Sequence, residues 1–172
     1  MKKVTFLLLG ALFGAALTLS ANPPDQGWFT SYREARAAAR AKNLPLFLLF
    51  TGSDWCPWCM KLHQETLDTA KFRDSVKDRF VLVYLDFPEK SKLPAALEWQ
   101  NRKLQERYKV EGFPTVIIAD PDGQVLASLE YAPPDEFLAR LRKISDAWRT
   151  LAVKAAAVPA AGPVARKPLA DK

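Results

Sequence analysis

The chain contains only two cysteines, Cys56 and Cys59, and just two residues separate them. A disulfide between them closes a very short loop and constrains little of the unfolded chain, so it cannot hold distant parts of a fold together. The fold must therefore be stabilised by a hydrophobic core, for which a hydrophobic content of 49% is sufficient. This leaves the cysteine pair with a local chemical role.

The N-terminus has the layout of a secretory signal peptide. Lys2 and Lys3 precede an apolar or small-residue run over 4–19, and small residues suited to cleavage follow it. We expect residues 1–21 to be the signal peptide. An uncleaved membrane anchor is the alternative, although the run is slightly shorter than the ~20 residues of a comfortable span. In both cases the folded part lies outside the cytoplasm, periplasmic or secreted, where disulfides persist.

Beyond the signal segment, apolar runs alternate with helix-forming stretches, which predicts an α/β fold. Strands are expected at 46–50, 80–87, 114–119 and 124–131, and helices at 31–42, 56–76 with a break near Asp68, 94–108 and from 133 onward. Helical crossovers imply parallel strands, whereas the Asp-Pro-Asp-Gly turn at 120–123 implies a hairpin.

We therefore expect a mixed central sheet of about four strands with helices on both faces, in one domain over 22–157. The Ala/Pro-rich residues 158–172 are expected to form a disordered tail. Removing Lys2 and Lys3 with the signal lowers the net charge from +6 to +4. Because this mild excess includes no dense Lys/Arg block, we expect no nucleic-acid binding.

The cysteine motif has the features of a dithiol exchange site. Pro57 suits the first position of a helix, which places Cys56 at the helix N-terminus, where backbone N–H groups favour the thiolate. Cys59 faces the same side one turn later and can attack a mixed disulfide formed by Cys56. We assign Cys56 as the nucleophile and Cys59 as the resolving thiol.

Half of a zinc site is the alternative explanation for the pair. Zinc in structural sites has four ligands, and this chain offers His63 beside the two cysteines but no second CxxC motif. We therefore expect no metal at the pair, and dithiol exchange needs no other cofactor.

The WCPWC motif at 55–59, placed after a buried strand, and the GFPT motif at 112–115, placed before another, resemble the thioredoxin superfamily. More narrowly, the motif is similar to exported bacterial thioredoxin-like domains with a WCxWC sequence. The resemblance covers roughly residues 30–148. It implies a thioredoxin-like fold with a cis peptide bond before Pro114, which lies against the cysteines and presents the Phe113 backbone to a substrate.

The resemblance also implies that Trp55 forms an apolar wall beside the nucleophile. The expected substrate-contacting residues are Trp55, Pro57, Trp58, Phe113 and Pro114. We assign Trp58 to substrate contact, with self-association as the alternative.

Two positions depart from the thioredoxin pattern. Phe50 stands six residues before the nucleophile, where thioredoxins carry a buried aspartate, and the strand over 80–87 lacks the accompanying lysine. The proton of Cys59 must therefore pass to water or to another group. Asp54 and Glu65 are candidates for that group, with a solvated surface acid as the alternative interpretation of each. The Pro-Trp dipeptide between the cysteines is typical neither of reductants nor of strong oxidants, so the direction of exchange stays open.

These observations predict a periplasmic thiol:disulfide oxidoreductase that exchanges disulfides with cysteines of exported proteins through Cys56 and Cys59. A second redox protein must restore the pair after each cycle, and membrane contact is expected only if the signal segment stays uncleaved. The alternative is a thioredoxin-fold binding or adaptor module in which the disulfide is passive.

Overall fold

The computed structural model describes residues 27–157, so the expected signal peptide over 1–21 and the expected tail over 158–172 lie outside the described residues. The strands are β1 (Trp28–Phe29), β2 (Leu46–Thr51), β3 (Val81–Asp86), β4 (Thr115–Ala119) and β5 (Val125–Glu130). The helices are α1 (Tyr32–Lys42), α2 (Pro57–Leu62), α3 (Ala70–Val76), α4 (Ala95–Tyr108) and α5 (Pro134–Ala157), and a π-helix, η1 (His63–Leu67), follows α2 directly.

The strands form one mixed sheet in the order β1-β3-β2-β4-β5. β1, β3 and β2 run parallel, and β4 and β5 are antiparallel to their neighbours. The expectation of about four strands missed β1. A strand of two residues is too short to show alternation in the sequence. Trp28 and Phe29 are extended because they pair with the edge of β3.

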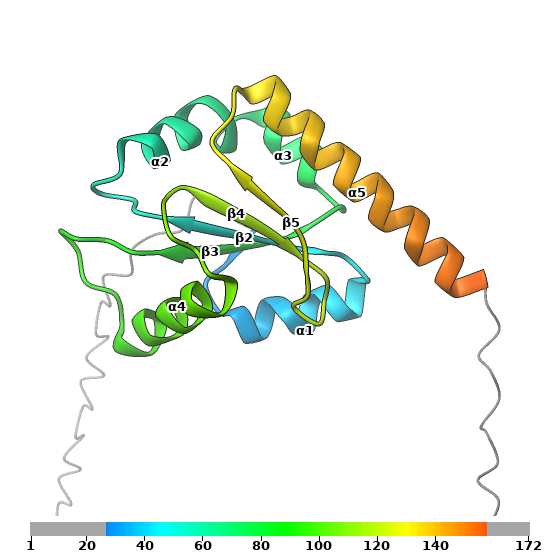
Figure 1. Cartoon of the computed structure of the whole chain (residues 1–172), viewed down its shortest axis with the longest axis horizontal. Coiled ribbons are helices and arrows are strands. Elements are labelled where there is room, and N and C mark those ends of the chain that lie inside the picture. Colours follow the sequence, from blue (N-terminus) through cyan, green and yellow to red (C-terminus); the bar gives the residue numbers. More distant parts are fainter. Residues whose placement is uncertain (1–26, 158–172) are drawn as a thin grey trace, which may run out of the picture.

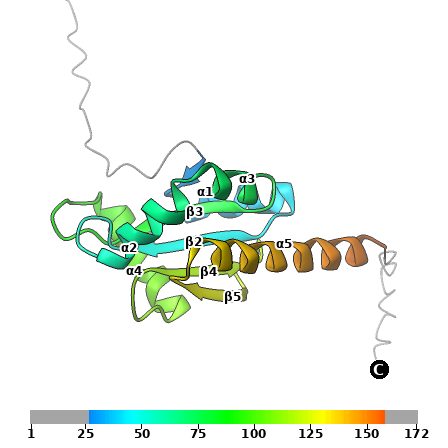
Figure 2. The same ribbon diagram turned by 90° about the horizontal axis from the view of Figure 1, so that it is seen from above.

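Helices cover both faces of the sheet, with α1 and α4 on one face and α2, α3 and α5 on the other (Figure 1). Seen from above, the far end of α5 extends past the sheet (Figure 2). Among residues 27–157, no helix combines the length and the apolar character that crossing a bilayer requires.

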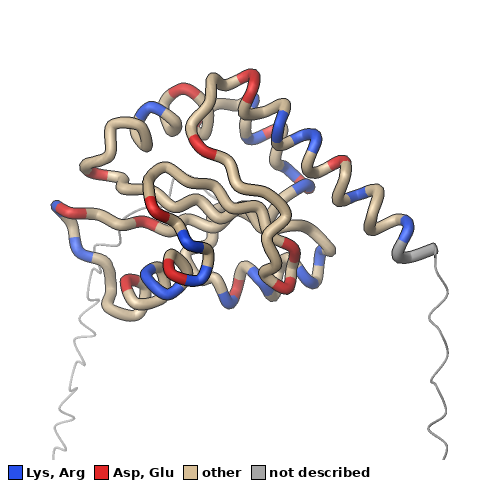
Figure 3. The backbone as a smooth tube through the Cα atoms, in the orientation of Figure 1, with Lys and Arg blue, Asp and Glu red and all other residues tan. Residues whose placement is uncertain are grey.

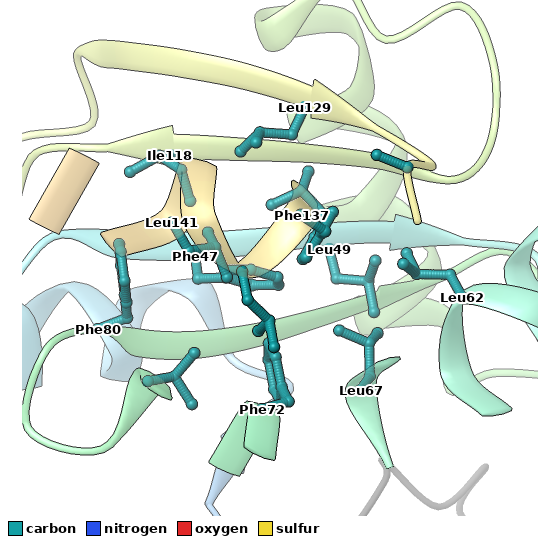
Figure 4. Close-up of a cluster of buried hydrophobic side chains, with 14 of the residues drawn as sticks. Phe47, Leu49, Leu62, Leu67, Phe72, Phe80, Ile118, Leu129, Phe137 and Leu141 are labelled. Carbon is teal, nitrogen blue, oxygen red and sulfur yellow. The ribbon is translucent and has the colours of Figure 1, made fainter. Parts of the chain in front are cut away.

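Strand β2 lies in the middle of the sheet, and all six of its residues are buried. Because side chains alternate along a strand, Phe47 and Leu49 belong to the core beneath α2, α3 and α5, which Figure 4 shows. Leu48 and Phe50 belong to the opposite core beneath α1 and α4. The continuous apolar run is therefore explained by burial on both faces.

Local capping sets the helix boundaries near the site. The hydroxyl of Ser31 accepts the N–H of Glu34 at the start of α1, as the capping pattern predicts. The predicted break near Asp68 is also present, since α3 begins after Thr69, whose hydroxyl accepts the N–H of Phe72.

Candidate redox site

The two cysteines lie at the start of α2, directly after the turn that follows β2. Cys56 is the N-cap residue of α2, and Pro57 is its first helical residue, as the sequence predicts. The N–H of Cys56 donates to the carbonyl oxygen of Gly52 at 3.0 Å, which closes the turn between strand and helix. The cysteine motif is thus held by a backbone contact that does not involve the sulfur atoms.

Cys56 and Cys59 form a disulfide, with their Cα atoms 5.2 Å apart. Each sulfur lies close to one backbone N–H group. The N–H of Cys59 is 3.1 Å from Sγ of Cys56, and the N–H of Gly52 is 3.4 Å from Sγ of Cys59. When the pair is reduced, such donors favour the thiolate over the thiol.

Both cysteines are buried, Cys59 slightly more deeply than Cys56. Cys59 is fully buried, whereas Cys56 keeps 3% of its surface exposed. The flanking Pro57 and Trp58 are exposed, so the rim of the site is open to solvent while the sulfur lies just below it. An approaching molecule therefore meets Cys56 before Cys59.

The loop before β4 packs against the cysteine pair. The Phe113–Pro114 peptide bond is cis, as the resemblance implies. The carbonyl oxygen of Phe113 lies 3.6 Å from Sγ of Cys56. Two segments that are more than fifty residues apart in sequence thus meet at the nucleophile.

Trp55 is held in place beside this loop. Its Nε1–H donates to the carbonyl oxygen of Phe87 at 2.7 Å, and its ring lies edge-on to that of Phe113, with 6.0 Å between the centroids. The residue is 37% exposed, so Trp55 forms a partly open wall.

Gly52 makes room for this arrangement, since a Cβ atom there would lie 2.5 Å from Cε2 of Trp55. The one sequence signal for this role of Gly52 is its position directly after the buried strand.

Trp58 belongs to a surface cluster that the sequence did not predict. The centroids of its ring and of the Tyr131 ring are 5.1 Å apart, and the ammonium of Lys61 lies 5.2 Å from each centroid. Tyr131 also donates a hydrogen bond to Glu65 at 2.7 Å. This Trp58 cluster, formed by Trp58, Lys61, Glu65 and Tyr131, joins α2 and η1 to the chain that follows β5.

A groove of about 550 Å³ extends from the Pro114 loop to the Trp58 cluster. Its lining includes Trp58, Phe113, Pro114, Thr115, Glu130 and Tyr131. Because Phe113 also touches Cys56, the groove begins beside the nucleophile. The structure therefore brings Trp55, Trp58, Phe113 and Pro114 together around the cysteines.

The two acids considered for proton uptake are engaged elsewhere. Asp54 accepts the N–H groups of Glu89, Lys90 and Ser91, and these bonds, that of Glu89 foremost, hold its pKa below the ordinary value. Glu65 accepts the Tyr131 hydroxyl. The interpretation of Asp54 and Glu65 as proton acceptors for Cys59 thus lacks support, because both carboxylates are oriented by other partners.

Phe50 does not occupy the face of the sheet on which α2 lies. Its ring packs in the α1/α4 core, 6.3 Å from the rings of Phe87 and Tyr108. The alternation of β2 places Thr51 on the α2 face instead. Counting positions along the sequence therefore identified a residue whose ring is part of the α1/α4 core.

A buried carboxylate, Asp86, fixes the turn that carries Gly52. It is 4% exposed and accepts both the N–H and the hydroxyl of Ser53, at 3.0 and 2.7 Å. The backbone carbonyl of Asp86 accepts the side-chain amide of Asn101 at 2.9 Å. Burial, with the charge of Asp86 adding to it, raises the pKa of the neighbouring Tyr84.

His63, the remaining ligand in the zinc alternative, has another partner. Its Nδ1 lies 3.4 Å from Oδ1 of Asp68. Within the described range 27–157, no three His, Cys, Asp or Glu side chains gather as ligands for a metal ion. Acidic and basic residues are interspersed around this region and over the rest of the described chain (Figure 3).

Comparison with known proteins agrees with this geometry. Residues 32–145 match the sequence profile of a family described as a thioredoxin-like domain. The disulfide bond reductase DsbH of Chlamydia pneumoniae is 36% identical over 103 residues, which cover 60% of this chain and 62% of that protein. The thioredoxin-related protein DsbJ of the same organism is 31% identical over 91 residues, 53% of this chain and 26% of DsbJ.

A solved structure of a DsbH oxidoreductase superposes with a TM-score of 0.66 at 28% identity, covering 77% of this chain and 95% of that one. The sequence alignments with the two curated relatives, DsbH and DsbJ, each span less than two thirds of the relative's length. The residues that match the family profile, 32–145, contain strands β2 to β5, the cysteine pair and the loop before β4.

Proposed function

Because this chain belongs to the thioredoxin-like domain family, we propose that it is a thiol:disulfide oxidoreductase acting on cysteines of exported proteins. The observation that carries the proposal is the Cys56–Cys59 disulfide at the start of α2, with Sγ of Cys56 beside the Phe113 carbonyl. The curated relative at 36% identity is named a disulfide bond reductase, which favours reduction of substrate disulfides as the direction of exchange.

The reaction proceeds by two thiol–disulfide exchanges. The thiolate of Cys56 attacks one sulfur of a substrate disulfide, a mixed disulfide forms, and the other substrate sulfur leaves and takes a proton. Cys59 then loses its proton and attacks Sγ of Cys56, which releases the second substrate thiol. The substrate gains two electrons and two protons, and the pair becomes the disulfide present in the structure.

The two sulfurs have separate roles in this reaction. Cys56 is the less deeply buried of the two cysteines, and the N–H of Cys59 favours its thiolate form. Cys59 is buried one turn later and reaches only Cys56. A redox partner with a lower potential must then reduce the pair for the next cycle.

Substrate contact falls to the residues around the groove. The backbone next to Pro114, where Phe113 and Thr115 are half-buried, can pair with an extended substrate strand, and the exposed Trp55, Pro57 and Trp58 offer apolar contact beside it. The groove of about 550 Å³ accommodates side chains that flank a substrate cysteine. This supports the assignment of Trp55, Pro57, Trp58, Phe113 and Pro114 to substrate binding.

The proposed setting is the periplasm, on the strength of the signal-like residues 1–21. The full-length protein, produced in a Gram-negative host, is expected to fractionate with periplasmic proteins, and a variant lacking residues 1–21 with the cytoplasm. Recovery of the full-length protein in the cytoplasmic fraction would contradict export, whereas recovery in the membrane fraction supports the anchor instead.

Trapping with Cys59→Ser tests the enzymatic role. The variant cannot resolve the intermediate, so full-length protein should accumulate mixed disulfides through Cys56 with exported proteins, visible on non-reducing gels. The Cys56→Ser/Cys59→Ser double variant is the matched control and should trap nothing. If the double variant keeps the same partners as the wild type and Cys59→Ser accumulates no mixed disulfide, the protein is an adaptor rather than an exchange enzyme.

A further inference from the structure

Lys61 contacts two aromatic rings that line the groove beside the cysteines. Its ammonium is 5.2 Å from the centroid of the Trp58 ring and 5.2 Å from that of the Tyr131 ring. Both distances lie within the roughly 6 Å over which the face of an aromatic ring attracts a cation. One charged group is thus shared by two rings from different parts of the chain, one in α2 and one in the segment after β5.

The two rings are held in place to different degrees. Tyr131 is half-buried against the core beneath α2, α3 and α5, and its hydroxyl donates a hydrogen bond to Glu65. Trp58 is 55% exposed, and its ring contacts the Tyr131 ring and the Lys61 ammonium. Lys61 therefore joins the more exposed ring to the one that the core already holds.

The carboxylate of Glu65 is a weaker partner for this ammonium than the rings are. Oε1 of Glu65 lies 4.0 Å from Nζ of Lys61, beyond hydrogen-bonding distance, and both side chains are more than a third exposed. An ion pair in such a position contributes little to stability, whereas attraction to two ring faces adds two separate contributions. The position of the Lys61 ammonium is therefore best explained by the two rings.

Fixing the Trp58 ring has a consequence for binding. Trp58 and Tyr131 both line the groove of about 550 Å³, and the groove begins beside Cys56 at the Phe113 loop. An exposed side chain that becomes ordered only on binding costs free energy, and this cost lowers the affinity. A cation that holds the indole in position before the substrate arrives reduces this cost.

We propose that Lys61 is a positioning residue for substrate binding, which holds Trp58 against Tyr131 and so pre-forms one wall of the groove for a protein substrate. This inference rests on the proposed oxidoreductase function and adds to it a determinant of substrate affinity. The exchange itself does not require Lys61, because the backbone N–H of Cys59 stabilises the thiolate of Cys56. A small disulfide that does not extend into the groove should therefore react equally well without Lys61.

Lys61→Gln removes the charge and keeps a residue of similar helix propensity. We expect KM for a peptide disulfide to rise about fivefold, because the cation–ring attraction is lost, while kcat stays within twofold of the wild type. Lys61→Arg keeps a cation that binds aromatic faces well and should restore the wild-type KM.

Lys103→Gln is the matched control. Lys103 is an exposed lysine on α4, which covers the opposite face of the sheet (Figure 1), and its ammonium pairs with Glu106 at 2.8 Å. This variant should leave KM unchanged. The double variant Trp58→Ala/Lys61→Gln tests the route of the effect, since loss of the lysine should add little to KM once the indole is absent.

The experiment follows the reduction of a self-quenched fluorescent peptide disulfide by each full-length protein. Excess dithiothreitol reduces the cysteine pair after each cycle, and circular dichroism confirms folding. The same variants are assayed with a small aromatic disulfide reagent, for which the Lys61→Gln rate should equal that of the wild type.

The inference is overturned if Lys61→Gln raises KM for the peptide less than twofold, or if Lys61→Arg or Lys103→Gln raises it equally. A rise that is as large in the Trp58→Ala background, or an equal loss of rate with the small reagent, would also overturn it. A wild type that reduces the peptide no faster than dithiothreitol alone would instead contradict the proposed function itself.

Discussion

Asp86 accepts hydrogen bonds from both the N–H and the hydroxyl of Ser53, although 33 residues separate the two in sequence. This contact joins the end of β3 to the turn after β2. Because Gly52 lies in that turn and contacts both cysteines through its backbone, Asp86 supports the geometry of the pair without touching it.

Replacing Asp86 should therefore destabilise the fold. Asp86→Ala leaves the N–H of Ser53 without its acceptor, whereas Phe87 keeps its second acceptor at Thr51, so we expect a loss of about 2 kcal/mol in unfolding free energy. Urea unfolding of the oxidised protein measures this loss. Ser53→Ala removes only the hydroxyl bond and should cost about half as much, and equal losses for the two variants would contradict the assigned role of the backbone contact.

Gly52 should tolerate no side chain. In Gly52→Ala the new Cβ would lie 2.5 Å from Trp55, so the indole must move and its bond to Phe87 is lost or distorted. We expect a loss of about 1–3 kcal/mol in stability, measured by urea unfolding, together with slower disulfide reduction. Gly112→Ala, in the loop before Pro114, is the control, because a Cβ there meets nothing within 4 Å. Similar losses for the two variants would refute the packing argument.

The Trp58 cluster should matter for protein substrates and not for small ones. Trp58→Ala removes an exposed aromatic contact at the rim of the groove, so we expect kcat/KM for a peptide disulfide to fall about tenfold. The rate with a small aromatic disulfide reagent should change little, since that reagent reaches Cys56 alone. Trp99→Ala removes a similarly exposed indole on α4 and should affect neither rate. Equal losses on both substrates would show that Trp58 acts on the chemistry rather than on binding.

The stability contributed by Asp54 should depend on pH. The N–H groups of Glu89, Lys90 and Ser91 bond to its ionised form and lower its pKa from 3.8. A lowered pKa means that the stabilisation is complete above about pH 4 and is lost as the pH falls through the lowered value. The difference in urea midpoint between wild type and Asp54→Asn should thus be present at pH 6 and vanish at strongly acidic pH. A difference that persists unchanged in acid would exclude ionised Asp54 as its source.

Several residues of the site could be read from the sequence, because the signals that define them are local. The start of α2 at Pro57 follows from the fixed geometry of proline, and the burial of β2 follows from its unbroken apolar run. The cis bond before Pro114 came from the resemblance of the GFPT motif to the family, and the structure contains it. These features depend on residues that are adjacent in the chain or on a motif that is preserved as a unit.

Phe50 shows where counting along the chain fails. Phe50 stands at the sequence position of the thioredoxin aspartate, six residues before Cys56. The alternation of side chains along β2 places its ring in the α1/α4 core. Whether a strand residue faces one side or the other changes with every single step, so the polar residue on the α2 face is Thr51. Asp54 and Glu65 were likewise near Cys59 in sequence, yet distant backbone and side-chain partners orient them elsewhere.

Local sequence signals predict the order of the helices and of the four longer strands, the α/β class and the place of the cysteine pair at a helix start, because periodicity and capping act over a few residues; they miss β1. Only the folded structure reveals that Tyr131 contacts Trp58 and that Asp86 accepts hydrogen bonds from Ser53, whereas the position of Phe113 beside Cys56 was expected from the family resemblance. Those contacts depend on how strands pair and how helices pack across the sheet, and no local pattern in the chain encodes which distant side chains then become neighbours.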